Sequence, residues 1–401
     1  MAVLQREYGR RRLMNQIRRS GPIPRIELAD LTGISRATVT TITAELLQSG
    51  LIEEVPRSQE DTDARRGRPR VDLKIRGAAR MVAGVKISNR QLSLVLLDFE
   101  GTQLGELEIE IEKPVHTPEE LAEILADAVE RLAKTSGYGI ADISGVGLGI
   151  AGVVKAEQGF IYWSPSLSER NVEFGRILGK RLGRPAFVDN DANLVAVAEK
   201  NFGLGRSHSD FIVVTIESGV GMGLIINGEL YRGTQGCGAE FGHTKVHLDG
   251  ALCRCGQRGC LEAYVADYAL LREAQTMPGA PAGNSASQQI EALLSAARGG
   301  DATAKRIVER AGRVFALGLA NLVNIFDPEL IILAGEQMQF DHLYAETVIE
   351  DMRKSIVQVD KPPSEVVIHK WGNLMWARGA AAYALDNVSE LALEELGENA
   401  A

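Results

Sequence analysis

From residue 80 onward the sequence passes twice through a similar order of strands and helices, and this repeat constrains the fold more than any other feature. Alternating and continuous apolar patterns predict the elements. The first pass predicts a strand pair (81–101), a third strand (102–114) and an amphipathic helix (117–137). A buried strand (143–154) and a strand that turns into a helix (185–203) follow. The second pass predicts a strand pair (210–230), a long helix (307–326), a buried strand (328–336) and a late helix (375–387). Two such passes predict two α/β lobes with a cleft between them.

The ends of these predicted elements indicate where the two lobes begin and end. Thr117 is the expected N-cap of the amphipathic helix. Residues 280–289 are rich in Ala, Gly and Ser and predict a mobile surface connection, and residues 388–401 are acidic, mostly helix-forming and expected to fray. We therefore place the first lobe at about 80–195 together with the C-terminal helix, and the second lobe at about 196–375.

The first 76 residues differ from the rest of the chain in charge. They hold 15 Lys and Arg against 10 Asp and Glu, whereas the remaining residues hold 29 against 43. A basic head on an acidic body indicates that only the head binds a polyanion. The prediction is one domain over 1–76 and a second over 77–401.

Three helices are predicted within this head. Gly33 supplies a tight turn between the second and the third helix, and Ser35 is a natural N-cap of the third. Apolar residues at helical spacing indicate the helices: Leu13, Ile17, Ile26, Leu28, Ala29, Leu31, Val39, Ile42 and Leu46. Two helices joined by a turn with glycine are typical of a helix-turn-helix unit. The residues expected to contact DNA from the start of its second helix are Ser35, Arg36, Thr38 and Thr41.

A basic hairpin follows these helices. Residues 51–55 and 70–75 alternate like two strands, and the segment between them is rich in arginine. Such a hairpin is a wing, whose arginines enter a minor groove or lie along phosphates. The arginines in question are Arg65, Arg66, Arg68 and Arg70. A plain helical bundle with a solvated linker is the alternative, but helix pair, wing and local charge together favour DNA binding.

All four cysteines of the chain lie between Cys237 and Cys260. The cluster could form disulfides, bind a metal or hold buried reduced thiols. One imidazole and three thiolates follow the pattern H-x9-C-x-C-x4-C, at His243, Cys253, Cys255 and Cys260. This set suits tetrahedral zinc, and four protein ligands leave no open position, so we predict structural Zn²⁺. Arg254 and Arg258 are the cations expected to offset the thiolate charge, and Cys237 is expected to be a free thiol.

The composition favours a cytoplasmic protein. No apolar run reaches the roughly 18 residues of a membrane span, and the charged N-terminus is followed by no apolar stretch of signal-peptide type. In a reducing compartment, clustered cysteines indicate metal more than disulfides. We therefore expect no membrane insertion and a cytoplasmic location.

Several long motifs resemble those of one known family. The stretch CRCGQRGCLE after GAEFGH resembles the signature of the ROK family of repressors, open reading frames and sugar kinases. Motifs at 189–199, 219–230, 321–336 and 377–385 follow in the family's order, and the head resembles that of its repressor branch. The resemblance covers nearly the whole chain. It implies an actin/hexokinase-like two-lobed (ribonuclease H-like) α/β fold behind an N-terminal winged helix-turn-helix, with a sugar in the cleft and one zinc.

The resemblance also implies a sugar site. The residues that match the family's sugar contacts are Asn190, Asp191, Glu240, His243 and Glu262. Carboxylates and an amide are good partners for vicinal hydroxyls, independently of the family. His243 would ligate zinc with one ring nitrogen and reach the sugar with the other, so the metal would orient a sugar contact. Asp191 matches the catalytic base of the family's kinases.

The phosphate-binding positions depart from the kinase pattern. The first hairpin turn of family kinases reads Asp-x-Gly-Gly-Thr, whereas this chain has Lys86, Ser88, Asn89 and Arg90 there. Bulky side chains obstruct the backbone approach to phosphate, although Lys86 could attract phosphate as a point charge. The second loop, usually Gly-Thr-Gly, reads Glu217-Ser218-Gly219, which sets a carboxylate where triphosphate would lie. Ser166 replaces an asparagine of the sugar loop.

We therefore predict a sugar-responsive regulator, most consistent with a repressor of carbohydrate genes, with no catalytic residue in use. Its partners would be operator DNA, a sugar or sugar phosphate, and a second copy of the chain in a homodimer or higher homo-oligomer. One alternative is an ATP-dependent sugar kinase with a DNA-binding head. Another is a regulator controlled by a protein partner, with an unused sugar site.

Overall fold

The computed structural model describes residues 2–56, 71–88, 90–277, 279, 283, 285–335, 346–357, 360, 362–369 and 374–398. The chain forms two compact units, the first from 1–189 and 376–401 and the second from 190–375. The chain therefore crosses between the units twice, once after Asp189 and once after Met375. In the described ranges no helix combines the length and apolarity that crossing a bilayer requires.

The N-terminal part of the first unit contains the predicted three helices and hairpin. The helices are α1 (Ala2–Ser20), α2 (Arg25–Thr32) and α3 (Arg36–Gln48), and strands β1 (Ile52–Pro56) and β2 (Val71–Ile75) pair antiparallel. Gly33 ends α2 in the left-handed conformation, at φ 66°, and the Ser35 hydroxyl accepts the Thr38 N–H at the start of α3. These features confirm the helix-turn-helix prediction. Ile26 and Leu31 are 60% and 55% exposed, so the buried side of α2 is formed by Leu28, Ala29 and Thr32.

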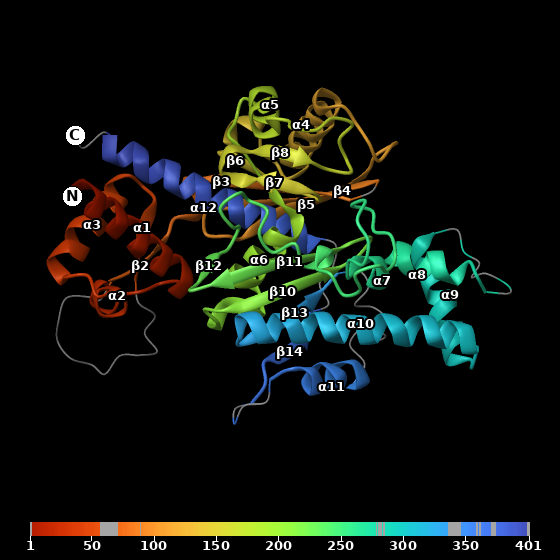
Figure 1. The fold of residues 1–401 in the computed structure, drawn as a ribbon. Helices are drawn as coiled ribbons and strands as arrows, with labels where there is room; N and C mark the ends of the chain where they lie inside the picture. Colours follow the sequence, from red (N-terminus) through yellow and green to blue (C-terminus); the bar gives the residue numbers. More distant parts are fainter. Residues whose placement is uncertain are drawn as a thin grey trace. The chain divides into compact units, whose positions relative to one another are not determined.

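A mixed five-stranded sheet forms the centre of the first unit, in the order β5-β4-β3-β6-β9. Its strands are β3 (Met81–Ile87), β4 (Gln91–Asp98), β5 (Gln103–Glu110), β6 (Gly145–Ile150) and β9 (Ala186–Asn190). Strands β3, β4 and β5 pair antiparallel, whereas β3 and β6 pair parallel. Helices α4 (Pro118–Thr135) and α5 (Phe174–Leu182) pack on one face (Figure 1). Thr117 forms a capping box with Glu120 at the start of α4, which confirms its predicted role. The short strands β7 (Val153–Lys155) and β8 (Phe160–Trp163) form a separate hairpin.

Helix α12 (Leu374–Glu398) covers the other face of this sheet (Figure 1). It lies very close to the strands, because a Cβ added at Gly84 would come within 2.1 Å of the Ala377 carbonyl oxygen. A Cβ at Gly147 would come within 1.9 Å of the Ala380 carbonyl oxygen. Residues 388–398 are helical, as the sequence indicated, but the expectation that they fray is wrong, because Val388, Ala392 and Leu393 are buried.

A second mixed five-stranded sheet forms the centre of the second unit, in the order β12-β11-β10-β13-β14. Its strands are β10 (Phe211–Ile216), β11 (Val220–Ile226), β12 (Glu229–Leu230), β13 (Leu330–Ala334) and β14 (Glu365–Ile368). The helices of this unit are α6 (Asp191–Phe202), α7 (Glu262–Val265), α8 (Asp267–Ala274), α9 (Ala286–Arg298), α10 (Ala302–Phe326) and α11 (Glu346–Ser355). Strands β10, β13 and β14 are parallel, and α10 packs along them to form the core (Figure 1). The predicted surface connection at 280–289 is wrong at its end, since 286–289 form the first turn of α9 behind the Ser285 cap.

Candidate functional site

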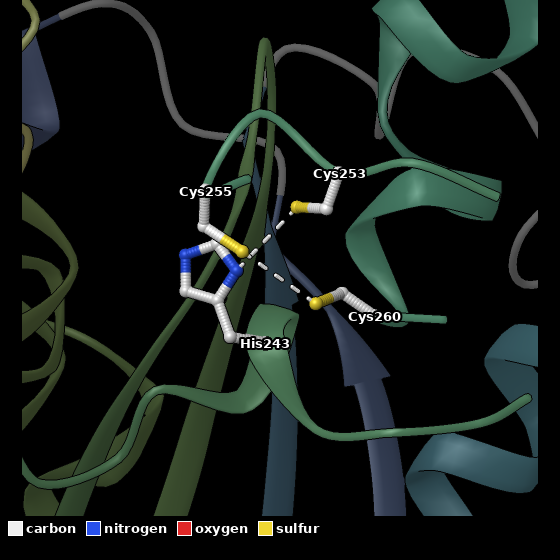
Figure 2. A group of neighbouring side chains, drawn as sticks. All are labelled: His243, Cys253, Cys255 and Cys260. Atoms are coloured by element: carbon white, nitrogen blue, oxygen red, sulfur yellow. Dashed lines mark hydrogen bonds between the residues drawn. The ribbon is translucent and has the colours of Figure 1, made fainter. Parts of the chain in front are cut away.

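Four candidate metal ligands converge in the second unit. The ligand atoms of His243, Cys253, Cys255 and Cys260 all lie within 4.8 Å of one another, and Figure 2 shows the four side chains pointing toward one another. The Nδ1 atom of His243 lies 3.7 Å from the Cys253 sulfur, and the Cys255 and Cys260 sulfurs are 3.7 Å apart. A tetrahedral ion with bonds of about 2.3 Å to sulfur requires a sulfur–sulfur separation of about 3.8 Å. The cluster therefore fits a tetrahedral metal, and its sulfurs are too far apart for a disulfide.

Two glycines shape the loop that carries the cysteines. Gly256 and Gly259 have φ of 87° and 77°, and a Cβ at Gly259 would lie 1.6 Å from the His247 carbonyl oxygen. The N–H of Cys253 donates to the Gln257 carbonyl at 2.8 Å and closes the tight turn that contains Cys255. The sequence thus brings Cys253 and Cys255 to one side of a knuckle, facing Cys260 just before α7.

The cation beside the sulfurs is not one of the two predicted. Lys245 Nζ lies 3.0 Å from the Cys260 sulfur, and this hydrogen bond raises the pKa of Lys245. Arg254 instead stacks on the ring of Tyr268, with its Cζ 4.0 Å from the ring centroid, and Arg258 donates to the Gly250 carbonyl. The sequence did not reveal Lys245 because its proximity to Cys260 comes from an isolated β-bridge between the two residues.

Cys237 lies outside the four-residue cluster. Its thiol is exposed and contacts the Gln235 carbonyl oxygen at 3.5 Å. It therefore offers a natural reference thiol for experiments on the other three.

Asn190 and Asp191 occupy the junction between β9 and α6. The side-chain oxygen of Asn190 accepts the N–H groups of Ala192 and Asn193, at 2.9 and 3.3 Å, and so caps α6. Asp191 is the first residue of α6, and one carboxylate oxygen accepts the Ala192 N–H at 3.0 Å. The cap fixes the backbone from which both predicted sugar contacts project.

Glu262 lies between the knuckle and the turn that precedes β11. It is 8% exposed, and one carboxylate oxygen accepts the Val220 N–H at 3.1 Å. The other oxygen accepts the Tyr268 hydroxyl at 3.3 Å and lies 3.6 Å from the Cys253 sulfur. Glu262 is therefore a buried, hydrogen-bonded carboxylate and not a surface charge. Tyr268, which the sequence did not single out, joins this carboxylate to a candidate metal ligand.

Glu240 precedes the short helical turn that ends at His243. The residue is exposed, but neighbouring atoms partly desolvate its carboxylate, which raises the pKa of Glu240, and the charges of Glu262 and Asp191 raise it further. His243 acts in the opposite direction. Two carboxylates and an imidazole thus lie near enough to Glu240 to act on its carboxylate electrostatically. Hydroxyl groups, which donate to carboxylates without adding charge, suit such a region.

The predicted phosphate positions have other partners. Lys86 is 4% exposed, and its Nζ lies 3.6 Å from the ring centroid of Trp376, so its charge is held against an aromatic face within the first unit. Asn89 lies outside the described residues. In the second unit, the N–H of Glu217 donates to the Gly219 carbonyl, and Arg254 donates to the Ser218 carbonyl at 3.4 Å. Ser166 is 9% exposed, and its carbonyl accepts the His116 N–H.

The candidate DNA contacts of the recognition helix are exposed. Ser35, Arg36, Thr38 and Thr41 all lie on the surface at the start of α3. Ser35 also caps the helix, and the Thr41 hydroxyl donates to the Ala37 carbonyl at 3.1 Å. The four wing residues Arg65, Arg66, Arg68 and Arg70 lie outside the described residues.

The sequence model of the ROK family matches residues 82–387. This chain belongs to the ROK family. Residues 10–66 match the MarR family model, and with the three helices and the paired strands they form an N-terminal winged helix of that type. The chain therefore combines a ROK family body with an N-terminal head of the MarR type.

Named relatives fall into two groups. The chain is 28% identical to the xylose repressor of Bacillus spizizenii over 321 residues, which is 80% of each chain. It is 30% identical to the glucokinase of Streptomyces coelicolor over 321 residues, 76% of this chain and 97% of the kinase. Among solved structures it resembles a ROK family transcriptional regulator described as a homolog of the E. coli MLC protein, with a TM-score of 0.81, 25% identity, and coverage of 98% of this chain and 99% of that one.

Proposed function

We propose that this ROK family protein is a sugar-responsive transcriptional repressor of carbohydrate uptake or catabolism genes. One observation carries the proposal: the chain joins a MarR-type head at 10–66 to a ROK body at 82–387. The body alone spans 97% of the related glucokinase, whereas the related transcriptional regulator aligns with 98% of this chain. A head of this kind has a use in DNA binding and none in phosphoryl transfer. Operator binding places the protein with the DNA in the cytoplasm.

The proposed effector is a sugar or sugar phosphate bound by Asn190, Asp191, Glu240, His243 and Glu262. The proposed metal is Zn²⁺, held by His243, Cys253, Cys255 and Cys260, since three thiolates and an imidazole are ligands that zinc prefers. When bound, zinc would supply structural rigidity and no open coordination position. Because His243 Nδ1 faces Cys253, the Nε2 nitrogen is the one assigned to the sugar.

Sugar binding acts on DNA binding only if the sugar has different affinities for two states of the protein. The first test is a thermal-shift screen with D-xylose, D-glucose, N-acetyl-D-glucosamine and their phosphates, because a ligand of the folded state raises its stability. Calorimetry then measures the affinity of each sugar that shifts the melting temperature. No binding of any of these compounds would favour control by a protein partner instead.

The alternative of a sugar kinase has a direct test. With ATP, Mg²⁺ and the same sugars, we expect no product, because Glu217 and the substituted first turn oppose triphosphate binding. A coupled assay with a ROK glucokinase as positive control measures this. Turnover at the rate of that kinase would overturn the non-enzymatic assignment.

The wing is proposed to contact DNA through its arginines, with the protein bound as a homodimer. Substituting Arg68 with alanine should weaken binding to an operator selected from a random duplex pool and lower the salt slope by about 1, because one phosphate contact is lost. Fluorescence anisotropy over a salt series measures both. The exposed Arg313 of α10, also changed to alanine, is the matched control. If both variants behave as the unmodified protein does, the wing makes no phosphate contact through Arg68.

A further inference from the structure

Arg18 fastens helix α1 of the head to helix α12 within the first unit. Its guanidinium donates to the Ser389 hydroxyl at 2.8 Å and to the Asp386 carboxylate at 3.5 Å. Its Cζ also lies 5.2 Å from the ring centroid of the fully buried Phe99. The side chain retains 13% exposure. Arg18 thus contacts two separate parts of the body, the helix and the turn after β4.

A buried guanidinium is costly unless its partners are arranged around it. Burial lowers the pKa of Arg18, and the charge of Asp386 opposes this effect. The Nε atom has no hydrogen-bond partner among the described residues, so the fork of the guanidinium carries the polar contacts. The contact therefore depends on the planar shape of arginine and not on charge alone.

Weaker contacts surround this one. Arg11 of α1 pairs with Glu390 at 2.6 Å, and Lys74 of β2 approaches Glu100 at 3.4 Å. Both are exposed pairs that contribute little stability by themselves. The N–H of Phe99 also donates to the Gly77 carbonyl at 2.9 Å, which attaches the segment after β2 to the body. These contacts surround the junction between the head and the body, and the largely buried Arg18 lies at the centre of that junction.

A second buried arginine, Arg10, connects α1 to α3, the second helix of the helix-turn-helix. Arg10 of α1 is 3% exposed and pairs with Glu45 of α3 at 2.8 Å. Burial would raise the pKa of Glu45, but hydrogen bonds from Arg6 and Arg10 hold it below its ordinary value. Since α1 is held at Arg10 by α3 and at Arg18 by α12, the orientation of α3 follows that of α12.

We propose that Arg18 is a positioning residue for DNA recognition, because it holds α1 against α12 and so sets the orientation of α3. The proposal has a second part: the sugar signal reaches the head through α12. The second part rests on the proposed function. The chain crosses from the second unit to the first in the first turn of α12, after Met375. Trp376, the next residue, is held by Lys86 of β3. A change in the second unit is therefore connected by the chain itself to the helix that holds the head.

The test compares Arg18→Ala in the full chain with Arg19→Ala, which removes the same charge from an exposed neighbour on the same helix. Hydrogen exchange without ligand should be about tenfold faster in α1 and α3 of the Arg18 variant, and unchanged in α10. Ser389→Ala, which removes one hydrogen bond without a large cavity, should change exchange in the same helices by a smaller factor. Arg18→Lys keeps the charge but not the fork, and should not restore protection.

The second measurement is operator affinity with and without D-xylose, D-glucose or N-acetyl-D-glucosamine. In the Arg18→Ala protein, sugar affinity by calorimetry should be unchanged, whereas the sugar-induced change in operator affinity should fall toward 1-fold. Equal exchange in α3 for the Arg18, Ser389 and Arg19 variants would overturn the proposal, as would a wild-type response to sugar in the Arg18 variant. If the wild-type protein responds to none of the sugars, the proposed function fails, and the exchange experiment still decides the role of Arg18.

Discussion

Replacing Cys255 with serine is expected to release the proposed zinc and to lower the melting temperature of the protein by several degrees. Cys255 is exposed, so the substitution removes a ligand without opening a cavity in the core. Changes to residues that only support a metal ligand weaken binding by about 10- to 100-fold, and loss of a ligand itself should exceed that range. Because the knuckle has few apolar contacts of its own, the proposed zinc would supply much of its folding free energy. Metal analysis of the purified protein and a thermal melt measure the two effects.

Cys237 provides the matched control for this experiment. Its substitution by serine removes an exposed thiol that lies 16 or more positions from each cysteine of the cluster, and should leave metal content and melting temperature unchanged. Equal metal content in the two variants and in the wild-type protein would exclude Cys255 as a ligand. Absence of metal from the wild-type protein after reconstitution with Zn²⁺ would end the zinc assignment altogether.

Substituting Glu240 with alanine is expected to weaken sugar binding by about 10- to 100-fold, since a hydrogen bond to a charged group contributes about 1.5–3 kcal/mol. Glu240 is the exposed carboxylate of the predicted sugar set, whereas both oxygens of Glu262 already accept hydrogen bonds from the protein. Removing Glu240 therefore removes a proposed sugar contact on the solvent-facing side of the site. Unlike removal of Glu262, it leaves no buried hydrogen-bond donor of the protein without its acceptor. Calorimetry with the sugar that gives the largest thermal shift measures the loss.

Operator binding and metal content separate a specific effect of Glu240→Ala from a general one. Both should equal the wild-type values, because Glu240 belongs neither to the head nor to the metal ligands. Glu309→Ala, which removes an exposed carboxylate from α10 in the same unit, should bind sugar normally. If the two variants bind sugar equally well, Glu240 is not a sugar contact.

Local patterns predicted much of the fold. The Ser35 cap, the Gly33 turn and the Thr117 capping box are decided by residues within a few positions of one another, so the sequence displays both partners. The same holds for the cysteine spacing, in which two ligands share one tight turn. Strand order is different, since pairing β3 with β6 depends on packing over the whole sheet.

Long-range partners explain what the sequence did not reveal. Fraying was expected at the end of α12 because Arg18, which donates to Ser389 in this segment, lies 371 positions away in the sequence. Lys86 suggested a phosphate contact because Trp376, which covers its ammonium group, belongs to the last helix. Lys245 and Tyr268 were missed for a related reason, since each lies 15 positions from the cysteine whose sulfur it contacts, Cys260 and Cys253 respectively.

The close seating of α12 on Gly84 and Gly147 has a consequence for how the protein is synthesised. About 220 residues separate the end of β6 from the start of α12. At roughly 5–20 residues per second, the ribosome needs about 10–45 s to produce the helix that covers this face of the sheet. During that interval, strands with an uncovered apolar face are open to aggregation. Helix α12 then completes the first sheet and docks α1, which emerged long before it, so a product truncated before α12 would have an uncovered sheet and an undocked head together.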